Sequence, residues 1–172
     1  MAPNRRTSPL THERLLSVLH YDPDTGRFTW LASLAHRVKV GDEAGSNHGS
    51  GYFEIGIDNV RYLAHRLAWF YMSGEWPSAQ IDHRDLDRSN TRWNNLRLAT
   101  HGQNVHNSGP RKHNSHGFKG VTFYPSKKTK WHARIMFQRK LYLLGFFNTP
   151  EEAHAAYAKK AAELHGEFAR TA

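Results

Sequence analysis

The chain has 172 residues, no cysteine and a formal net charge of +9. Its length suits one ordinary domain or two small ones, and the lack of cysteine excludes disulfides and thiolate zinc sites. No run of 18 apolar residues is present, so the sequence predicts no membrane-spanning helix. The first ten residues lack the apolar core of a signal peptide. We therefore expect a cytoplasmic protein without a membrane partner.

The positive charge is concentrated toward the C-terminus. Residues 1–107 contain 12 Lys and Arg against 11 Asp and Glu, whereas residues 108–172 contain 12 against 4. A basic face attracts polyanions and speeds encounter with them. The charge alone fits either a solvated basic surface or a nucleic-acid partner.

The first half of the chain predicts a small mixed α+β region. Thr11 is a good N-cap for the first helix, and Gly74 is placed to end the second. Hydrophobic periodicity and turn residues predict these elements in chain order: a helix over residues 12–20, a strand over 27–30, a loop over 41–51, a hairpin over 52–64 and a helix over 65–73.

Two short strands and a helix follow, and polar residues stand at their ends. Residues 80–83 and 95–99 predict the strands, and Thr100 with Gln103 predicts the capping box of the helix. Such an arrangement can bring together the polar residues at the element ends. These are Asp82, His83, Asn95 and Asn104.

These residue types suit the hydrolysis of a phosphodiester, which requires a hard cation and a base that activates water. Mg²⁺ prefers oxygen ligands and keeps most of its waters, so the carboxylate of Asp82 and the amide of Asn104 suffice. His83 has the near-neutral pKa of a general base. Asn95 is placed to hold the intervening loop or to orient the imidazole. We expect one divalent cation, Mg²⁺ or Mn²⁺. The alternative is a set of ordinary turn residues beside a surface histidine.

Several motifs in this region occur in a known order. The chain reads His-Arg-Leu-Ala-Trp at 65–69, Ile-Asp-His at 81–83, Asn-Asn-Leu-Arg-Leu-Ala-Thr at 94–100 and Gln-Asn at 103–104. Residues 50–107 thus resemble the HNH endonucleases of the phage and homing-endonuclease branch.

The resemblance implies a ββα-metal module in which Asp82 and Asn104 bind one metal. It makes His83 the general base and Asn95 the middle asparagine. Many such enzymes have a histidine where Asn104 stands, which favours a magnesium-like site over a zinc-like one. For His65, contact with DNA and a structural role in the helix both remain open.

Beyond a predicted linker at residues 108–117, the pattern changes to three strands and a helix. The strands are expected at about 120–124, 131–138 and 141–147, and the helix from Pro150 to the glycine at 166. Alternation places Trp131, Ala133, Ile135 and Phe137 against the helix, and Lys130, His132, Arg134, Met136 and Gln138 on the outer face.

This tail resembles the AP2 DNA-binding domain, through Gly-Val at 120–121, Lys-Trp at 130–131, Leu-Gly-Phe-Phe at 144–147 and the Ala-rich helix. The resemblance implies a three-stranded antiparallel sheet, packed on one helix, that enters the DNA major groove. Thr122, Met136, Leu141 and Leu143 depart from the arginine or tryptophan of that family. The expected DNA contacts, several of them to phosphates, are Lys119, Tyr124, Lys127, Lys128, Lys130, Arg134, Arg139 and Lys140.

The sequence therefore predicts an α+β protein with an HNH ββα-metal module within residues 1–107, a linker at 108–117 and an AP2-like domain at 118–172. We expect a metal-dependent endonuclease that acts on double-stranded DNA. One site per chain favours nicking by a monomer. The family implies a phage or homing origin, with action in a bacterial host cell. The alternative is a non-catalytic DNA-binding regulator with a decayed nuclease fold.

Overall fold

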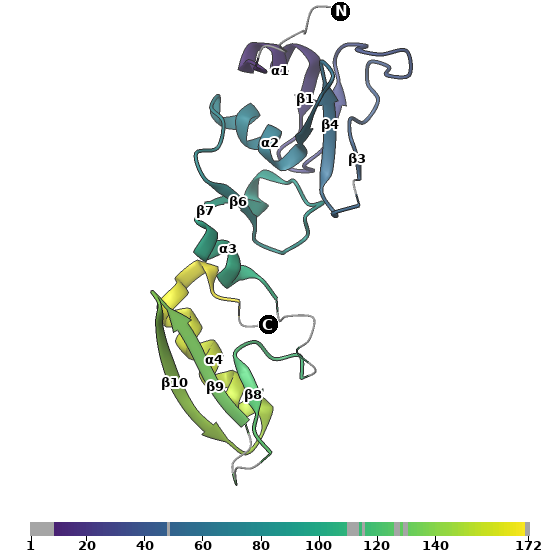
Figure 1. The fold of residues 1–172 in the computed structure, drawn as a ribbon. Helices are drawn as coiled ribbons and strands as arrows, with labels where there is room; N and C mark the ends of the chain where they lie inside the picture. Colours follow the sequence, from purple (N-terminus) through teal and green to yellow (C-terminus); the bar gives the residue numbers. More distant parts are fainter. Residues whose placement is uncertain are drawn as a thin grey trace, which may run out of the picture. The chain divides into compact units, whose positions relative to one another are not determined.

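A computed structural model describes residues 9–47, 49–109, 114, 116–125, 128 and 131–170. The chain divides into two compact units, Met1–Ala99 and Thr100–Ala172. Each unit combines helices with small antiparallel sheets (Figure 1), which agrees with the α+β class. No helix in the described part of the chain is long and apolar enough to cross a bilayer.

The described residues of the first unit form two helices, a 3-10 turn and three small sheets, paired as β1–β2, β3–β4–β5 and β6–β7. The elements are α1 (His12–Val18), β1 (Leu19–Tyr21), β2 (Phe28–Trp30), β3 (Ser46–Asn47), β4 (Phe53–Ile57), β5 (Val60–Leu63), α2 (Ala64–Ser73), β6 (Gln80–His83), η1 (Trp93–Asn95) and β7 (Leu96–Ala99).

One hydrophobic core joins almost the whole of this unit. Leu15 of α1, Ile55 of β4 and Leu67 of α2 are at most 1% exposed, and Ile81 and Leu96 of the β6–β7 pair belong to the same cluster. The first helix is shorter than the predicted 12–20, because Leu19 and His20 belong to β1. The core connects the N-terminal elements to β6 and β7.

The β4–β5 hairpin confirms its predicted turn. Asp58 and Asn59 have φ of 50° and 65°, the left-handed pair that a two-residue type I′ turn requires. Asp58 also forms an ion pair with Arg14, at 2.8 Å between Oδ1 and Nη2. That contact holds the tip of the hairpin against α1.

The second unit contains one sheet in the order β10–β9–β8, with α4 along one of its faces (Figure 1). Its elements are α3 (His101–Asn107), β8 (Val121–Phe123), β9 (Trp131–Phe137), β10 (Lys140–Phe147), α4 (Pro150–His165) and the 3-10 turn η2 (Gly166–Phe168).

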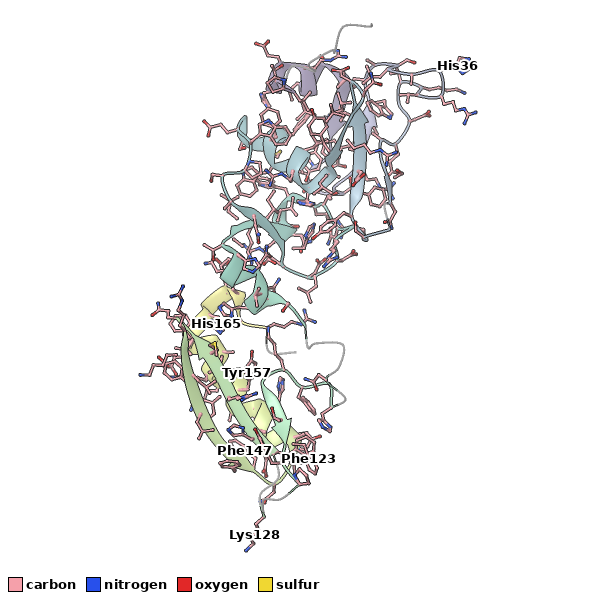
Figure 2. The ribbon with its side chains drawn as sticks, viewed as in Figure 1. His36, Phe123, Lys128, Phe147, Tyr157 and His165 are labelled. Carbon is pink, nitrogen blue, oxygen red and sulfur yellow. The ribbon has the colours of Figure 1, made fainter. Side chains whose placement is uncertain are left out.

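Alternation along β9 is confirmed for the face that meets α4. Ala133 and Ile135 are 0% and 4% exposed and pack in clusters with Ala153 and Tyr157 of α4. Tyr157, labelled in Figure 2, packs on Ile135 of β9. The outer face is less open than alternation predicts, because His132 is only 9% exposed.

Phe146 and Tyr124 cover His132, with ring centroids at 4.9 and 5.6 Å from its imidazole. His132 pairs with the exposed Phe146 and so lies on the outer face as expected, but these rings bury it there. Alternation gives the direction of a side chain but not the neighbours that lie over it.

The two units divide before α3, whereas the sequence places its boundary after residue 107. Contacts within the second unit explain the difference. The ammonium of Lys119 donates to the carbonyls of Val105, His106 and Ser108 at 3.3, 2.6 and 2.7 Å. The ring of His106 also stacks on that of His165, 3.7 Å between centroids. These contacts attach α3 to the second unit.

Candidate active site

The β6–β7 pair places the predicted polar residues at one end of a short antiparallel hairpin. In its register Asp82 lies opposite Arg97, and His83 lies opposite Leu96. Asp82 and His83 are only 4% and 5% exposed. Two consecutive polar residues are thus buried at the end of a strand, which is unusual for residues that serve only a surface turn.

Asp82 is held by a guanidinium group that the sequence does not single out. Nε and Nη2 of Arg97 lie 2.8 and 2.7 Å from Oδ2 of Asp82. Both side chains are buried, so the attraction acts in a medium of low polarity and also offsets a large loss of hydration. Arg97 therefore orients the Asp82 carboxylate and places a cation against it.

His83 lies in an environment that favours neutral imidazole. Burial lowers its pKa from the ordinary value, although the nearby carboxylates of Asp85, Asp82 and Asp87 act in the opposite direction. A neutral ring is the form that can accept a proton from water. The position next to Asp82 and this protonation state match what a general base requires.

Asn95 fixes the loop that connects β6 with β7. Its Oδ1 accepts from the backbone N–H of Asp85 at 3.1 Å, and its Nδ2 donates to Oδ1 of Asp85 and to the carbonyl of Asn90, both at 2.9 Å. The sequence predicts that Asn95 either holds this loop or orients the imidazole. Its hydrogen bonds in the structure hold the loop.

The N-terminal region supports the same loop from outside the motif. The hydroxyl of Tyr21 donates to the carbonyl of Thr91 at 2.6 Å, and Oγ1 of Thr91 donates to the carbonyl of Gly26 at 2.6 Å. The backbone N–H of Trp93 donates to the carbonyl of Pro23 at 3.0 Å. No local sequence signal predicts these contacts, because the partners are about 65–70 residues apart.

His65 lies beside His83 and not on an exposed surface. It is 6% exposed, and its ring centroid is 5.0 Å from that of His83 in an edge-to-face arrangement. The ring of Tyr52 lies 5.1 Å from His65 and 6.0 Å from His83. Burial therefore opposes the alternative in which His65 contacts DNA.

Asn104 lies on α3, in the second unit, whereas Asp82, His83 and Asn95 belong to the first. The capping box between Thr100 and Gln103 is confirmed, so Asn104 stands in the first turn as expected. Within the described ranges, no group of three or more His, Cys, Asp or Glu side chains is placed to hold a metal. The pairing of Asp82 with Asn104 stays a prediction.

Residues 62–106 match the family model described as HNH endonuclease. The matched HNH segment runs from β5 to α3 and includes His65, Asp82, His83, Asn95 and Asn104. It supports a nuclease that acts on DNA. No curated protein and no solved structure matches the chain.

The predicted DNA contacts of the second unit differ in their surroundings. Tyr124, Lys128, Arg134, Arg139 and Lys140 are exposed, and Figure 2 shows Lys128 projecting from one end of the unit. Lys127 and Lys130 lie outside the described residues.

Lys119 differs from these exposed residues. Burial lowers its pKa to about 8, and its ammonium already donates to the three carbonyls at the end of α3. A contact from Lys119 to a phosphate would have to replace these bonds.

Buried histidines make the stability of the first unit sensitive to acid. Burial, with smaller effects of His83 and Arg66, lowers the pKa of His65 from 6.5 to about 3. Between these values the unfolded chain binds a proton that the folded chain does not, so stability is lost as the pH falls. We expect each pH unit below about 6 to cost up to about 1.4 kcal/mol from this residue. Urea unfolding of wild type and His65→Phe at pH 7.5 and 5.5 measures this loss of unfolding free energy. The variant should lose less than wild type between the two pH values. Equal losses would contradict the assignment.

Proposed function

We propose that the chain is a metal-dependent HNH endonuclease that nicks duplex DNA, with the phage or homing character of its branch. In this proposal Asp82 and Asn104 hold one Mg²⁺ or Mn²⁺, His83 is the general base and Asn95 fixes the loop beside it. The observation that carries the proposal is the matched segment with Asp82 and His83 buried side by side at the end of β6. We place the nuclease module within residues 1–107, the linker at 108–117 and an AP2-like DNA-binding domain at 118–172.

The donor chemistry of the proposed ligands fits a hard cation. A carboxylate and a carboxamide oxygen are ligands that Mg²⁺ accepts while it keeps most of its waters, so a larger cluster of acidic side chains is not required. When bound, the cation would polarise the scissile phosphate and stabilise charge on the leaving oxygen.

The chain itself supplies the proton transfer and the positioning. A ring nitrogen of neutral His83 takes a proton from the attacking water, which makes that water a better nucleophile. Arg97 orients the Asp82 carboxylate through contacts from Nε and Nη2. Asn95 holds the β6–β7 loop through Asp85 and Asn90, so the end of β6 is fixed before DNA binds.

The second unit is proposed to hold the duplex through the outer face of its sheet. Arg134 lies on this face, and Arg139 and Lys140 lie at the turn between β9 and β10. Met136, Leu141 and Leu143 are 52–61% exposed on the same sheet. Cationic side chains contact phosphates and position the protein on the duplex. Apolar side chains make uncharged contacts with the edges of the bases.

A plasmid assay tests the nuclease. Wild type with Mg²⁺ or Mn²⁺ should convert supercoiled plasmid to nicked circles. His83→Ala should slow this by about 10²–10⁴-fold, the typical contribution of a general base, with DNA affinity unchanged. His36→Ala is the matched control, since His36 is exposed in the loop labelled in Figure 2. The proposal fails if wild type binds DNA but leaves the plasmid intact with both metals.

A DNA-binding regulator with a decayed nuclease site remains the second candidate. The observation that favours it is the ion pair of Asp82 with Arg97, because the guanidinium already balances the charge of the proposed metal ligand. The same assay separates the two functions. A regulator would shift DNA on a gel equally well as wild type and as His83→Ala, and neither protein would cut.

Salt dependence tests the proposed anchor. Each phosphate contact that is removed lowers the slope of log affinity against log salt by about one. We expect the double variant Arg139→Ser/Lys140→Ser to lower it by about two, with weaker binding to all sequences. Lys159→Ser is the control, because Lys159 is exposed on α4, which covers the other face of the sheet. An unchanged slope in the double variant would exclude the β9–β10 turn from the anchor.

A further inference from the structure

We infer that His65 is a positioning residue for the nuclease site, and that its ring, together with Tyr52, fixes the orientation of the His83 imidazole. This inference rests on the proposed function, in which His83 activates water. It assigns a task to the first histidine of the His-Arg-Leu-Ala-Trp motif, for which the sequence leaves two roles open.

The three rings form one compact cluster. The His65 and His83 centroids are 5.0 Å apart with an interplanar angle of 78°. Tyr52 lies 5.1 Å from His65 and 6.0 Å from His83, inclined by 44° and 51°. Edge-to-face rings at these distances attract one another and prefer a defined mutual orientation. Each ring therefore restricts how the other two can turn.

Regular elements supply two of the rings, and the third lies at the start of a strand. His65 is the second residue of α2, Tyr52 directly precedes β4, and His83 ends β6. The guanidinium of Arg88 lies 4.9 Å above the ring of Tyr52 and donates to the carbonyl of Ser50 at 3.1 Å. The cluster is thus closed by a side chain from the same loop that Asn95 holds. A base carried by such elements keeps its orientation better than one on a free loop.

Burial indicates that His65 is more than a filler of the core. Its Nδ1 is buried and has no hydrogen-bond partner among the described residues. A buried polar atom without a partner costs stability, and an apolar side chain of similar volume would avoid that cost. The flat ring of His65 gives His83 an edge-to-face neighbour that an aliphatic side chain of similar volume does not give.

Orientation of the base has a large effect on rate. Displacement of a reacting group by about 1 Å can lower a rate by about 10²-fold. Substrate binding does not depend on the direction of the imidazole to the same degree. Loss of the His65 ring should therefore lower kcat and leave KM nearly unchanged, the signature of a contact that matters in the transition state.

Two apolar substitutions separate the effect of the His65 ring from the effect of its polar nitrogen atoms. His65→Leu fills the site without an aromatic edge, whereas His65→Phe retains a ring. We expect His65→Leu to lower kcat about 10–100-fold, with KM within about twofold, and His65→Phe to recover most of the loss. His12→Ala is the control: His12 packs on Phe70 of the same helix α2, 5.4 Å between centroids, and should leave both constants unchanged.

A second readout does not require cleavage. In NMR spectra, the nuclear Overhauser effects between the ring protons of His83 and their other neighbours, such as Tyr52, should change in His65→Leu and should remain close to wild type in His65→Phe. Full activity of His65→Leu, or equal loss in both variants, would overturn the inference. If wild type does not cut plasmid at all, the proposed function fails, and the spectra still test whether His65 orients His83.

Discussion

An Arg97→Met variant is expected to lose about 3–5 kcal/mol of unfolding free energy, the usual cost of breaking a buried ion pair by removing one partner. Arg97 and Asp82 are 7% and 4% exposed, and both contacts from the guanidinium end on the same carboxylate oxygen. Methionine fills similar space but leaves the carboxylate without its cation. Urea unfolding at neutral pH, followed by the fluorescence of the first unit's tryptophans, measures the loss.

A double variant provides the control for this effect. Asp82→Leu/Arg97→Met replaces both charges with apolar groups and should recover most of the stability, since well-packed apolar residues can substitute for a buried pair. It should not cut DNA, because the proposed metal ligand is gone. A loss below about 1 kcal/mol in Arg97→Met would place the pair in the range of exposed salt bridges and contradict its burial.

A Gly120→Ala variant is expected to destabilise the second unit by roughly 2–4 kcal/mol, from overpacking together with a left-handed backbone. Gly120 has φ of 74°, and a methyl group there would overlap the ring of Tyr157 and lie 2.9 Å from the carbonyl oxygen of Arg134. Both neighbours belong to the packed interface of β9 with α4. Hydrogen exchange of β9 amides in the intact chain reports the loss.

Gly117→Ala is a matched control for the steric part. Gly117 has nearly the same φ, 73°, but a methyl group there meets nothing within 4 Å. It should therefore lose only the backbone contribution, about 1 kcal/mol. The difference between the two variants measures the contact with Tyr157. Equal losses of stability in Gly120→Ala and Gly117→Ala would mean that α4 shifts away from residue 120 at no cost in free energy.

Local signals account for the parts of the fold that the sequence predicts. Thr11 caps α1, Asp58 and Asn59 form the hairpin turn, and Thr100 with Gln103 caps α3, as expected. Each depends on residues within four positions of one another. The cap of α4 is equally local: Oγ1 of Thr149 accepts from the N–H of Glu152, and the carboxylate of Glu152 accepts from the N–H of Asn148.

The candidate site is predicted less completely, because its supporting contacts are distant in sequence. Motif spacing identifies Asp82, His83 and Asn95, and the capping pattern places Asn104 at the start of a helix. The partners that hold these residues follow no spacing rule. Arg97 lies opposite Asp82 in the register of β6 and β7, and Tyr52 contacts His83 from a distant part of the chain. The same limit explains Lys119, which matches a DNA-contact position of the AP2 family although its ammonium donates to carbonyls at the end of α3.

The shared hydrophobic core of the first unit decides whether the nuclease motif can be moved into another protein without the elements that precede it. The match covers residues 62–106, yet Ile81 and Leu96 pack in one cluster with Leu15 and Ile55. A peptide trimmed to the matched segment would leave this apolar surface in water and would lose the braces from Tyr21 and Pro23. Transplanting the motif into another scaffold would therefore require the preceding elements from α1 onward, moved as one piece.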